Sequence, residues 1–450
     1  MKKVMTIAGS DSSAGAGIQA DLKTFSALGV YGTTVITTLT AQNTKTISDI
    51  LVVPPKFLKN QIVTTLEDIK PDAIKIGVVY SKSIINTIKT ILKNFKNPIV
   101  VDPVISSGTG VKLLGEDSFE QYKREIIPLA HVITPNLREA EFLSKIKIGN
   151  RRDMTKAASE IFKLGASNII IKGGHNTTND SKVIDLLFRE KITSPHEIVH
   201  KRLEIDETHG TGCNFSAAIA SFLVKGYSIS ESFQLSNNYV YEALRSSNRI
   251  GDGVLVSNPL DRMYENSEKF KVLIELQHCV KILERIPNFF RLVPETKTNF
   301  VYSVEIPKNF NDIAGVVGRL TDLGKEIRTP NLVQFGASVH VSNALLAAVK
   351  FNPLIRSAIN IRNNAEIVNI CKNKFKCSSY SRSKETKSIK KIEGSSILWG
   401  ISEAFRKKTD AEVVYHDGDF GKEPMVIIYG QNPKDVLDKI RIVLKSYVKN

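Results

Sequence analysis

Cysteine is scarce in this sequence, and long apolar runs are absent. The four cysteines among the 450 residues are Cys213, Cys279, Cys371 and Cys377. Their spacing matches no metal-binding pattern, and so few cysteines argue against a disulfide framework. No apolar run is long enough to cross a bilayer, and Met1-Lys2-Lys3 leads directly into a short apolar strand rather than the apolar core of a signal peptide. We therefore expect a cytoplasmic protein without structural zinc, disulfides or membrane contact.

The remaining composition is that of an ordinary globular protein with a basic surplus. Hydrophobic residues make up 42% and charged residues 24%, enough for two or three domains. The formal net charge is +16, which favours phosphorylated ligands or nucleic acid as partners. The segment 372–391 holds eight basic residues and one acidic residue. We interpret it as a mobile, solvated loop rather than a nucleic-acid patch, and we find no helix-turn-helix unit.

Short apolar strands alternate with amphipathic helices over the first 260 residues. The expected strands are Val4–Ala8, Thr33–Leu39, Ala73–Ile76, Ile99–Val101, Val132–Thr134 and Asn168–Ile171. The expected helices are Ile18–Leu28, Lys56–Asp68, Ser83–Phe95, Leu137–Ser144 and Met154–Leu164. This alternation predicts an α/β fold with a mainly parallel sheet flanked by helices, whose ligands bind beyond the carboxyl ends of the strands.

The pattern changes near Asn258-Pro259. A long amphipathic helix is expected over Tyr264–Arg285, and a second α/β region follows from Thr298. Its expected strands are Val301–Ile306, Ser338–Val341, Ala358–Ile361, Glu412–Tyr415 and Met425–Tyr429, and its expected helices are Asn343–Phe351, Ser395–Lys407 and Pro433–Val448. We predict three parts: a domain over 1–260, a helical linker over 261–292, and a second α/β domain over 293–450.

A glycine-flanked turn, His209-Gly210-Thr211-Gly212-Cys213, runs directly into an alanine-rich helix. The N–H groups of Gly210 to Cys213 would lie at the positive end of that helix, which suits the charge of a transferring phosphoryl group. A thiol in the first helical turn is expected to have a lowered pKa, so Cys213 could act as a base. A tight turn with a small buried cysteine explains the same residues.

Other polar residues also follow predicted strands. A flexible loop of small residues, Gly9 to Gly17, opens the first helix, where Asp21 complements the positive helix end. Gln42 could offer a donor and an acceptor to a planar heterocycle. Glu139 is either a helix-start carboxylate or a residue that holds Mg²⁺ through water, and Lys172 could neutralise phosphate. All of these lie on one rim of one sheet.

The order of these motifs resembles the hydroxymethylpyrimidine/phosphomethylpyrimidine kinases, which have the ribokinase-like fold. The resemblance covers residues 1 to about 258 and rests on AGSDSSAGAGIQADLKTFSALG, AQNT, TPNLREAE, IKGGH and HGTGC. It implies two ATP-dependent transfers: phosphorylation of the hydroxymethyl group of 4-amino-5-hydroxymethyl-2-methylpyrimidine, and then phosphorylation of the monophosphate to the pyrophosphate.

The resemblance also implies roles for single residues. These are pyrimidine binding by Gly9, Asp21 and Gln42; an anion hole of Gly210, Thr211, Gly212 and Cys213; Mg²⁺ held through water by Asn136 and Glu139; and nucleotide binding by Lys172 and Thr208. Cys213 would accept the proton in the first transfer, whereas the nucleophile of the second is already an anion. One position departs from the family: Gly108 stands where the family has a lysine, so a positive contact near the phosphates is missing or comes from elsewhere.

The second half has fewer signals. Arg319 lies beside flexible glycines, His340 is expected at a strand end, and Lys422 lies in a charged loop. Arginine suits phosphate oxygens and histidine can exchange protons near neutral pH, but structural roles for both stay open.

Several segments of this half resemble the archaeal-type (ThiN) thiamine-phosphate synthases. They are VPETKTNFVY, VGRL, FGASVH, NIR and GKEPM, within residues 264–448. The resemblance implies coupling of hydroxymethylpyrimidine pyrophosphate to hydroxyethylthiazole phosphate, with release of pyrophosphate. Arg319 and His340 match the family's functional positions, and Arg382 and Lys422 are further candidates for phosphate contacts.

Two other functions stay open at this point. The second domain could sense thiamine phosphate without catalysis, or the first could act on pyridoxal, whose ring is similar in size. In each case we expect ATP, Mg²⁺ and small-molecule substrates, no nucleic acid, and a homo-oligomer.

Overall fold

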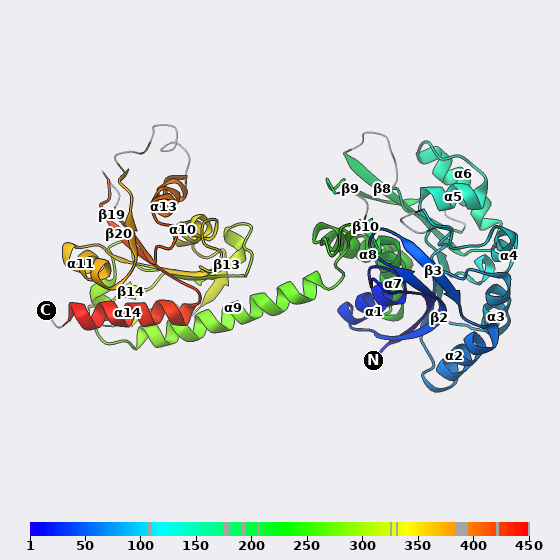
Figure 1. Cartoon of the computed structure of the whole chain (residues 1–450), viewed down its shortest axis with the longest axis horizontal. Helices are drawn as coiled ribbons and strands as arrows, with labels where there is room; N and C mark the ends of the chain where they lie inside the picture. The colour runs from blue at the N-terminus through cyan, green and yellow to red at the C-terminus, as the bar shows by residue number, and fades with distance from the viewer. Residues whose placement is uncertain are drawn as a thin grey trace. The chain divides into compact units, whose positions relative to one another are not determined.

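The structure is a computed structural model of the whole chain. It describes residues 1–106, 110–174, 181–190, 194–205, 208–324, 326–329, 332–382, 385, 395–419 and 423–448. The chain divides into two compact units, Met1–Tyr264 and Glu265–Asn450. Each unit has its own sheet with helices packed against it (Figure 1).

The described part of the first unit contains a nine-stranded sheet of order β3-β2-β1-β4-β5-β6-β7-β8-β9. The strands are β1 Lys3–Asp11, β2 Tyr31–Gln42, β3 Ile47–Val52, β4 Ala73–Ile76, β5 Ile99–Val101, β6 Val132–Ile133, β7 Asn168–Ile171, β8 Lys182–Arg189 and β9 His196–Lys201. Pairing is parallel from β2 to β7 and antiparallel at β2–β3 and β7–β8–β9. A separate short pair joins β10 (Thr208–His209) to β11 (Leu255–Val256).

Helices cover both faces of this sheet. One face is covered by α2 (Pro55–Asp68), α3 (Lys82–Leu92), α4 (Phe119–Glu125), α5 (Leu137–Ser144) and α6 (Arg151–Phe162), and the other by α1 (Gly17–Ala27), α7 (Thr211–Val224) and α8 (Ile229–Arg245). Strand β4 shows the alternation that divides the two cores, because Ile74 and Ile76 join the first and Ala73 joins the second. The carboxyl ends of the parallel strands therefore meet at one rim between two helical layers.

The predicted α/β fold with a mainly parallel sheet is confirmed. The bounds predicted for Ala73–Ile76, Ile99–Val101 and Asn168–Ile171 are those of β4, β5 and β7. Strands β3, β8 and β9 were not predicted. Strands β3 and β9 lie at the sheet edges, where partial exposure permits charged side chains such as Asp49 and Glu197 and weakens the apolar signal. Strand β8 is paired on both sides and carries the buried apolar run Leu186–Phe188, which was not identified from the sequence.

The second unit is also a layered α/β structure, but its sheet is mostly antiparallel. The order is β16-β13-β12-β17-β20-β19-β18, and only β18–β19 are parallel. The strands are β12 Phe300–Ser303, β13 Ile313–Val316, β16 Val333–Phe335, β17 Ser357–Arg362, β18 Cys377–Ser379, β19 Val413–His416 and β20 Met425–Gly430, with a separate pair of β14 Thr321–Asp322 and β15 Ile327–Arg328. Helices α9 (Asp261–Glu284), α11 (Ala365–Lys374) and α14 (Pro433–Tyr447) pack on one face, and α10 (Val339–Val349) and α13 (Ser395–Lys407) on the other.

Three expectations for this half differ from the structure. The strand expected at Ser338–Val341 is the start of helix α10, because Ser338 takes the N-cap position and the apolar spacing beyond it is helical. The expected linker helix joins the core of the second unit from Val272 onward. The first part of the basic segment is not a solvated loop: it forms the end of α11 and strand β18, and Arg382 is buried.

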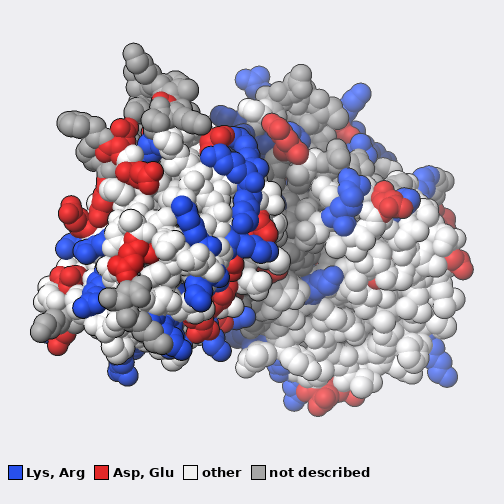
Figure 2. Space-filling model, turned by 60° about the vertical axis from the view of Figure 1, so that its left-hand side comes forward, with Lys and Arg blue, Asp and Glu red and all other residues white. Residues whose placement is uncertain are grey.

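Charged side chains of both signs are scattered over the face of the molecule seen in Figure 2, and Lys and Arg side chains also gather along one strip. The Lys and Arg side chains are thus unevenly distributed over that face. No helix within the described ranges is both long and apolar enough to span a membrane.

Candidate functional site

A cavity of about 720 Å³ lies in the first unit, where the parallel strands end. The predicted site residues that line it are Gly9, Gln42, Asn136, Glu139, Lys172, Thr208, Gly210, Thr211, Gly212 and Cys213. The structure therefore brings together residues as far apart in the sequence as Gly9 and Cys213, as expected for the carboxyl rim of a parallel sheet.

The turn before α7 has the geometry of an anion site. Gly210 is the N-cap residue with φ +87°, and a Cβ built there would lie 2.0 Å from the backbone oxygen of Gly15. Only glycine fits this position. Asn214 N–H makes the first hydrogen bond of the helix, to Gly210 O at 2.9 Å. The N–H groups of residues 211–213 precede it and have no acceptor within the helix, so they can bind an oxyanion.

Lys172 meets this turn from the end of β7. Its Nζ lies 3.3 Å from Asp102 Oδ1, and a Cβ built at Gly212 would lie 3.4 Å from the same nitrogen. Burial alone would lower the pKa of Lys172, but the carboxylates of Asp102 and Glu139 outweigh burial and raise it. The ammonium group therefore stays charged beside the anion-binding turn, where it can neutralise phosphate.

Asn136 and Glu139 begin helix α5 with a capping box. Asn136 Oδ1 accepts from Glu139 N–H at 2.9 Å, and Glu139 Oε2 accepts from Asn136 N–H at 2.8 Å. The helix-start role considered for Glu139 is thus confirmed. Burial raises the pKa of Glu139 to about 8, opposed by Lys172 and supported by Asp102. A positive charge added next to this carboxyl would stabilise its ionised form and lower its pKa.

The expectation for the Cys213 thiol is wrong in the free protein. We expected its pKa to fall at the helix start, but burial raises the pKa of Cys213 to about 12, and the positive charge of Lys75 only partly offsets burial. Desolvation of the thiolate therefore outweighs the helix end.

Asp21 does not line the cavity. Its side chain is fully buried on α1, where Oδ2 accepts from Thr6 Oγ1 at 2.6 Å and from Lys75 Nζ at 2.9 Å. Lys75 lies between Asp21 and the cavity and lines the latter. The pyrimidine contact implied for Asp21 by the resemblance has no support in this geometry.

Gln42 lies at the cavity with both ends of its amide engaged. Thr40 Oγ1 donates to Gln42 Oε1 at 3.1 Å, and Gln42 Nε2 lies 2.7 Å from His209 Nε2. Gly9 lies at the bulge of β1, where a Cβ would lie 2.7 Å from Thr38 Oγ1. Thr208 Oγ1 lies 2.9 Å from Thr211 Oγ1 in the anion-binding turn.

Several cavity residues were not identified from the sequence. They are Asp11, Lys75, Asp102, Asp185 and His209. Asp102 directly follows the apolar run of β5, and Lys75 interrupts that of β4. A charged residue within or just after a strand buried on both faces was the signal that could have found both.

In the second unit, Arg319 and His340 approach the same end of the sheet. Arg319 follows β13 with φ +66°, is exposed, and donates from Nη1 to Thr296 O. His340 lies in the first turn of α10, not at a strand end. Ser338, the N-cap of α10, packs against Gly315 near the end of β13, where a built Cβ would lie 3.0 Å from Ser338 Cβ. The first turn of α10 therefore begins near the sheet end that carries Arg319.

Arg382 is at the same end, following β18. Its side chain is 7% exposed, and burial together with the Arg382 charge lowers the pKa of His416 to about 4. Lys422 lies outside the described residues, as do Gly108 and most of the segment 383–394.

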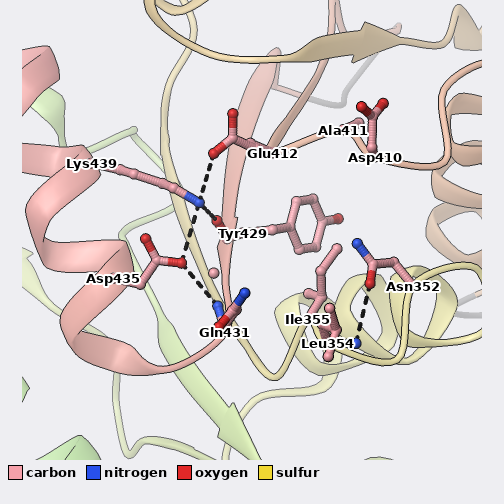
Figure 3. A pocket seen from close by; sticks show the side chains of 11 residues that line it. Asn352, Leu354, Ile355, Asp410, Ala411, Glu412, Tyr429, Gln431, Asp435 and Lys439 are labelled. Carbon is pink, nitrogen blue, oxygen red and sulfur yellow. Dashed lines mark hydrogen bonds and ion pairs between the residues drawn. The ribbon is translucent and has the colours of Figure 1, made fainter.

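A second cavity, of about 400 Å³, lies at the opposite end of this sheet, beside Gly430 and Ile355 (Figure 3). Its cation is already paired, since Lys439 Nζ lies 3.2 Å from Glu412 Oε1 and 3.4 Å from Asp435 Oδ2. Arg319 and His340 do not line it. We therefore do not connect this cavity with the predicted second site.

An anion-binding helix start, a charged lysine and two acidic side chains at the carboxyl rim of a parallel sheet define a phosphotransferase of the ribokinase-like class. The chain belongs to the phosphomethylpyrimidine kinase family, whose model matches residues 11–258, and residues 275–442 match thiamine-phosphate synthase ThiN. It is thus a bifunctional enzyme of thiamine biosynthesis with a kinase and a synthase domain.

Relatives agree with this assignment. The chain is 31% identical over 448 residues to the bifunctional thiamine biosynthesis protein ThiDN of Methanocaldococcus jannaschii, covering 99% of both chains. It is 40% identical over 252 residues to the hydroxymethylpyrimidine/phosphomethylpyrimidine kinase of Bacillus subtilis, covering 56% of this chain and 92% of the relative. A solved pyridoxal kinase of Staphylococcus aureus, in complex with AMP-PCP and pyridoxal, is 35% identical with a TM-score of 0.52, covering 58% of this chain and 94% of the other.

Proposed function

We propose that residues 1–260 transfer two phosphoryl groups from ATP to 4-amino-5-hydroxymethyl-2-methylpyrimidine, and that residues 293–450 couple the resulting pyrophosphate to hydroxyethylthiazole phosphate. The observation that carries the first half is the convergence of Gly212, Lys172 and Asp102 within one cavity. The likeness to the AMP-PCP-bound pyridoxal kinase supports ATP as the donor.

In this proposal, different residues of the cavity bind the phosphoryl group, the pyrimidine and the nucleotide. The N–H groups of residues 211–213 stabilise the negative charge on the transferring group, and Lys172 neutralises phosphate oxygens. Gln42, and Gly9 at the bulge, face the pyrimidine, while Thr208 lies beside the nucleotide. Cys213 Sγ accepts the hydroxyl proton in the first transfer.

Mg²⁺ fits the start of helix α5. Glu139 lines the cavity, its pKa is raised to about 8, and the capping box engages only its Oε2. Asn136 and Glu139 would hold the ion through water, and the ion would neutralise charge on the nucleotide phosphates.

In the second domain, Arg319 and His340 would stabilise the departing pyrophosphate while the thiazole nitrogen attacks the pyrimidine methylene. Their approach to one end of the sheet supports this role. Arg382, buried at the same end, is a further phosphate contact in this proposal, with Lys422 as a candidate from sequence alone.

One coupled assay tests the whole proposal. The full chain with the pyrimidine, thiazole phosphate, ATP and Mg²⁺ should form thiamine phosphate, and each phosphorylated pyrimidine should appear in turn. ATP consumption without thiamine phosphate would indicate a second domain that senses rather than catalyses. Pyridoxal should be tested as an alternative substrate, because the chain resembles pyridoxal kinases as well. Faster turnover of pyridoxal than of the pyrimidine would overturn the pyrimidine assignment. We also propose a homo-oligomer, which sedimentation equilibrium would test.

A further inference from the structure

Lys75 is a lysine in the middle of a buried parallel sheet. It is fully buried in β4, and its neighbours Ile74 and Ile76 both point into the core under α2 to α6. Alternation along the strand therefore directs Lys75 to the opposite face, which α1 and α7 cover. Lysine is almost never fully buried unless its charge is compensated, so this position requires a specific partner.

That partner is Asp21. Lys75 Nζ lies 2.9 Å from Asp21 Oδ2, and Thr6 Oγ1 donates to the same oxygen at 2.6 Å. On its other side the ammonium is next to Gly77, where a built Cβ would lie 3.0 Å from Nζ. Lys75 and Gly77 line the cavity, whereas Asp21 does not. The Asp21 carboxylate thus binds the Lys75 ammonium on the side away from the cavity, and the opposite side of the ammonium faces the cavity.

Cys213 lies on the same face of the sheet. Helix α7 packs against β4, and Cys213, in the first turn of α7, lines the cavity together with Lys75. Further charged residues that line this cavity include Asp102, Glu139 and Lys172.

The charges around Cys213 act in opposite directions. Burial raises the pKa of its thiol to about 12, Lys75 is the strongest influence that lowers it, and Asp21 raises it. Burial would lower the pKa of Lys75, but Asp21 and the neighbouring acidic groups raise it, so the lysine stays protonated. Lys75 is thus the cation best placed to stabilise a thiolate at Cys213.

We propose that Lys75 is a positioning residue of the kinase, whose ammonium group, held by Asp21, stabilises the thiolate form of Cys213 for the first phosphorylation. The inference rests on the proposed kinase function. In the step, the oxygen of the hydroxymethyl group forms a bond to the γ-phosphorus of ATP while its proton passes to Cys213 Sγ. The bond between the γ-phosphorus and the bridging oxygen breaks, and ADP leaves with that electron pair. Lys75 keeps its protons throughout, and Asp21 acts through Lys75 without touching the pyrimidine.

The first experiment measures the thiol directly. The full chain is treated with iodoacetamide over a range of pH, and alkylation of Cys213 is followed by mass spectrometry. At a fixed pH, Lys75→Met should slow alkylation at least about tenfold, since one unit of pKa changes the thiolate fraction tenfold. Asp21→Asn keeps the acceptor for Thr6 and Lys75 but removes the negative charge, so it should accelerate alkylation. A purely structural pair would not give opposite signs.

The second experiment compares the two phosphorylations. Lys75→Met should reduce the first transfer far more than the second, whose nucleophile is an anion and needs no base. In a Cys213→Ala background, Lys75→Met should have no further effect on the first transfer, because the group it acts through is gone. If Lys75→Met does not fold with Asp21 unpaired, Lys75→Met/Asp21→Asn removes both charges at similar volume and should still slow alkylation relative to the wild type.

The proposal is overturned if the Lys75 variants alkylate Cys213 at the wild-type rate, or if they slow both transfers equally. Failure of the wild type to phosphorylate the pyrimidine would instead refute the proposed function. The alkylation rates would still measure the influence of Lys75 on the thiol, so the two failures are distinguishable.

Discussion

His209 Nε2 lies 3.0 Å from Asp11 Oδ2, and this contact joins two segments that are 198 residues apart. Asp11 also accepts from Gly15 N–H at 3.0 Å and from Ala16 N–H at 2.8 Å, which fixes the loop of small residues before α1. Burial would raise the pKa of Asp11, but the hydrogen bonds from His209 and the loop hold it at about 2. Because His209 directly precedes Gly210, its imidazole lies beside this loop, Gln42 and the anion-binding turn, and its single Nε2 either donates to Asp11 or accepts from the Gln42 amide.

Replacing His209 should therefore weaken pyrimidine binding. His209→Leu removes the partner of Gln42 and of Asp11, and we expect the KM for the pyrimidine to rise about tenfold, since one lost hydrogen bond to a buried charged group costs about 1–3 kcal/mol. Steady-state kinetics of the first phosphorylation measure this. His196→Leu is the matched control, because His196 does not line the cavity. An unchanged KM in His209→Leu would show that the imidazole does not orient Gln42.

Gly210→Ala tests the anion-binding turn. The added methyl would meet Gly15 O at 2.0 Å in a backbone conformation with φ +87°. The turn must shift, and we expect both phosphorylations to fall by about 100-fold or more, as for loss of an oxyanion donor. Gly226→Ala is the control, since its φ is +93° but nothing lies within 4 Å of its Cβ position. Equal losses in the two variants would attribute the effect to backbone strain alone.

Cys213→Ala should separate the two transfers. Removing the thiol takes away the proton acceptor for the hydroxymethyl group, so the first transfer should fall by about 100-fold or more. The second transfer should change much less, because its nucleophile is already a phosphate anion. Separate assays with the free pyrimidine and with its monophosphate measure the two rates. Equal losses in both half-reactions would contradict a role for Cys213 as the base.

Much of the kinase site could be predicted because sequence order and sheet geometry agree. Gln42, Glu139 and Lys172 lie at or just after strands of the parallel sheet, whose carboxyl ends meet at one rim, so they could be assigned to one cavity before their contacts were seen. The turn that carries Cys213 follows the separate short strand β10, yet it lines the same cavity.

The parts that could not be predicted depend on burial and pairing across the fold. A thiol at a helix start is expected to have a lowered pKa, but burial in the cavity wall raises the pKa of Cys213. The burial of a single side chain cannot be predicted from the sequence. Asp21 was expected to complement the positive start of α1, but it lies beyond the first turn, and only the structure shows that it is paired with Lys75. At Ser338–Val341, β-branched residues favoured a strand, but tertiary packing and the N-cap serine made a helix.

Arg319→Ala tests the second domain independently of the first. The guanidinium group is exposed beside β13, so its loss should leave the fold and ATP consumption intact. Thiamine phosphate formation should fall by about 100-fold or more if this group stabilises the leaving pyrophosphate. Arg441→Ala is the control, because Arg441 is an arginine of α14 paired with Asp438. Undiminished coupling in Arg319→Ala would contradict the synthase site proposed here.

Asp185 predicts a pH dependence of stability. It lines the cavity at β8, its Oδ1 accepts from Gly173 N–H at 2.7 Å, and burial raises its pKa from 3.8 to about 6. The folded chain then binds this proton more tightly than the unfolded chain, so stability is lost as pH rises from about 4 to about 6. The full loss is about 3 kcal/mol, because one unit of pKa is worth about 1.4 kcal/mol.

Asp185→Asn keeps an acceptor for Gly173 N–H and cannot ionise. The variant should therefore gain stability relative to the wild type between pH 4 and pH 7, by up to about 3 kcal/mol, in calorimetry of the full chain. Asp49→Asn is the control, since Asp49 is exposed on the edge strand β3 and should show no such trend. A stability difference between Asp185→Asn and the wild type that does not change with pH would mean that Asp185 is ionised in the folded chain as readily as in the unfolded one.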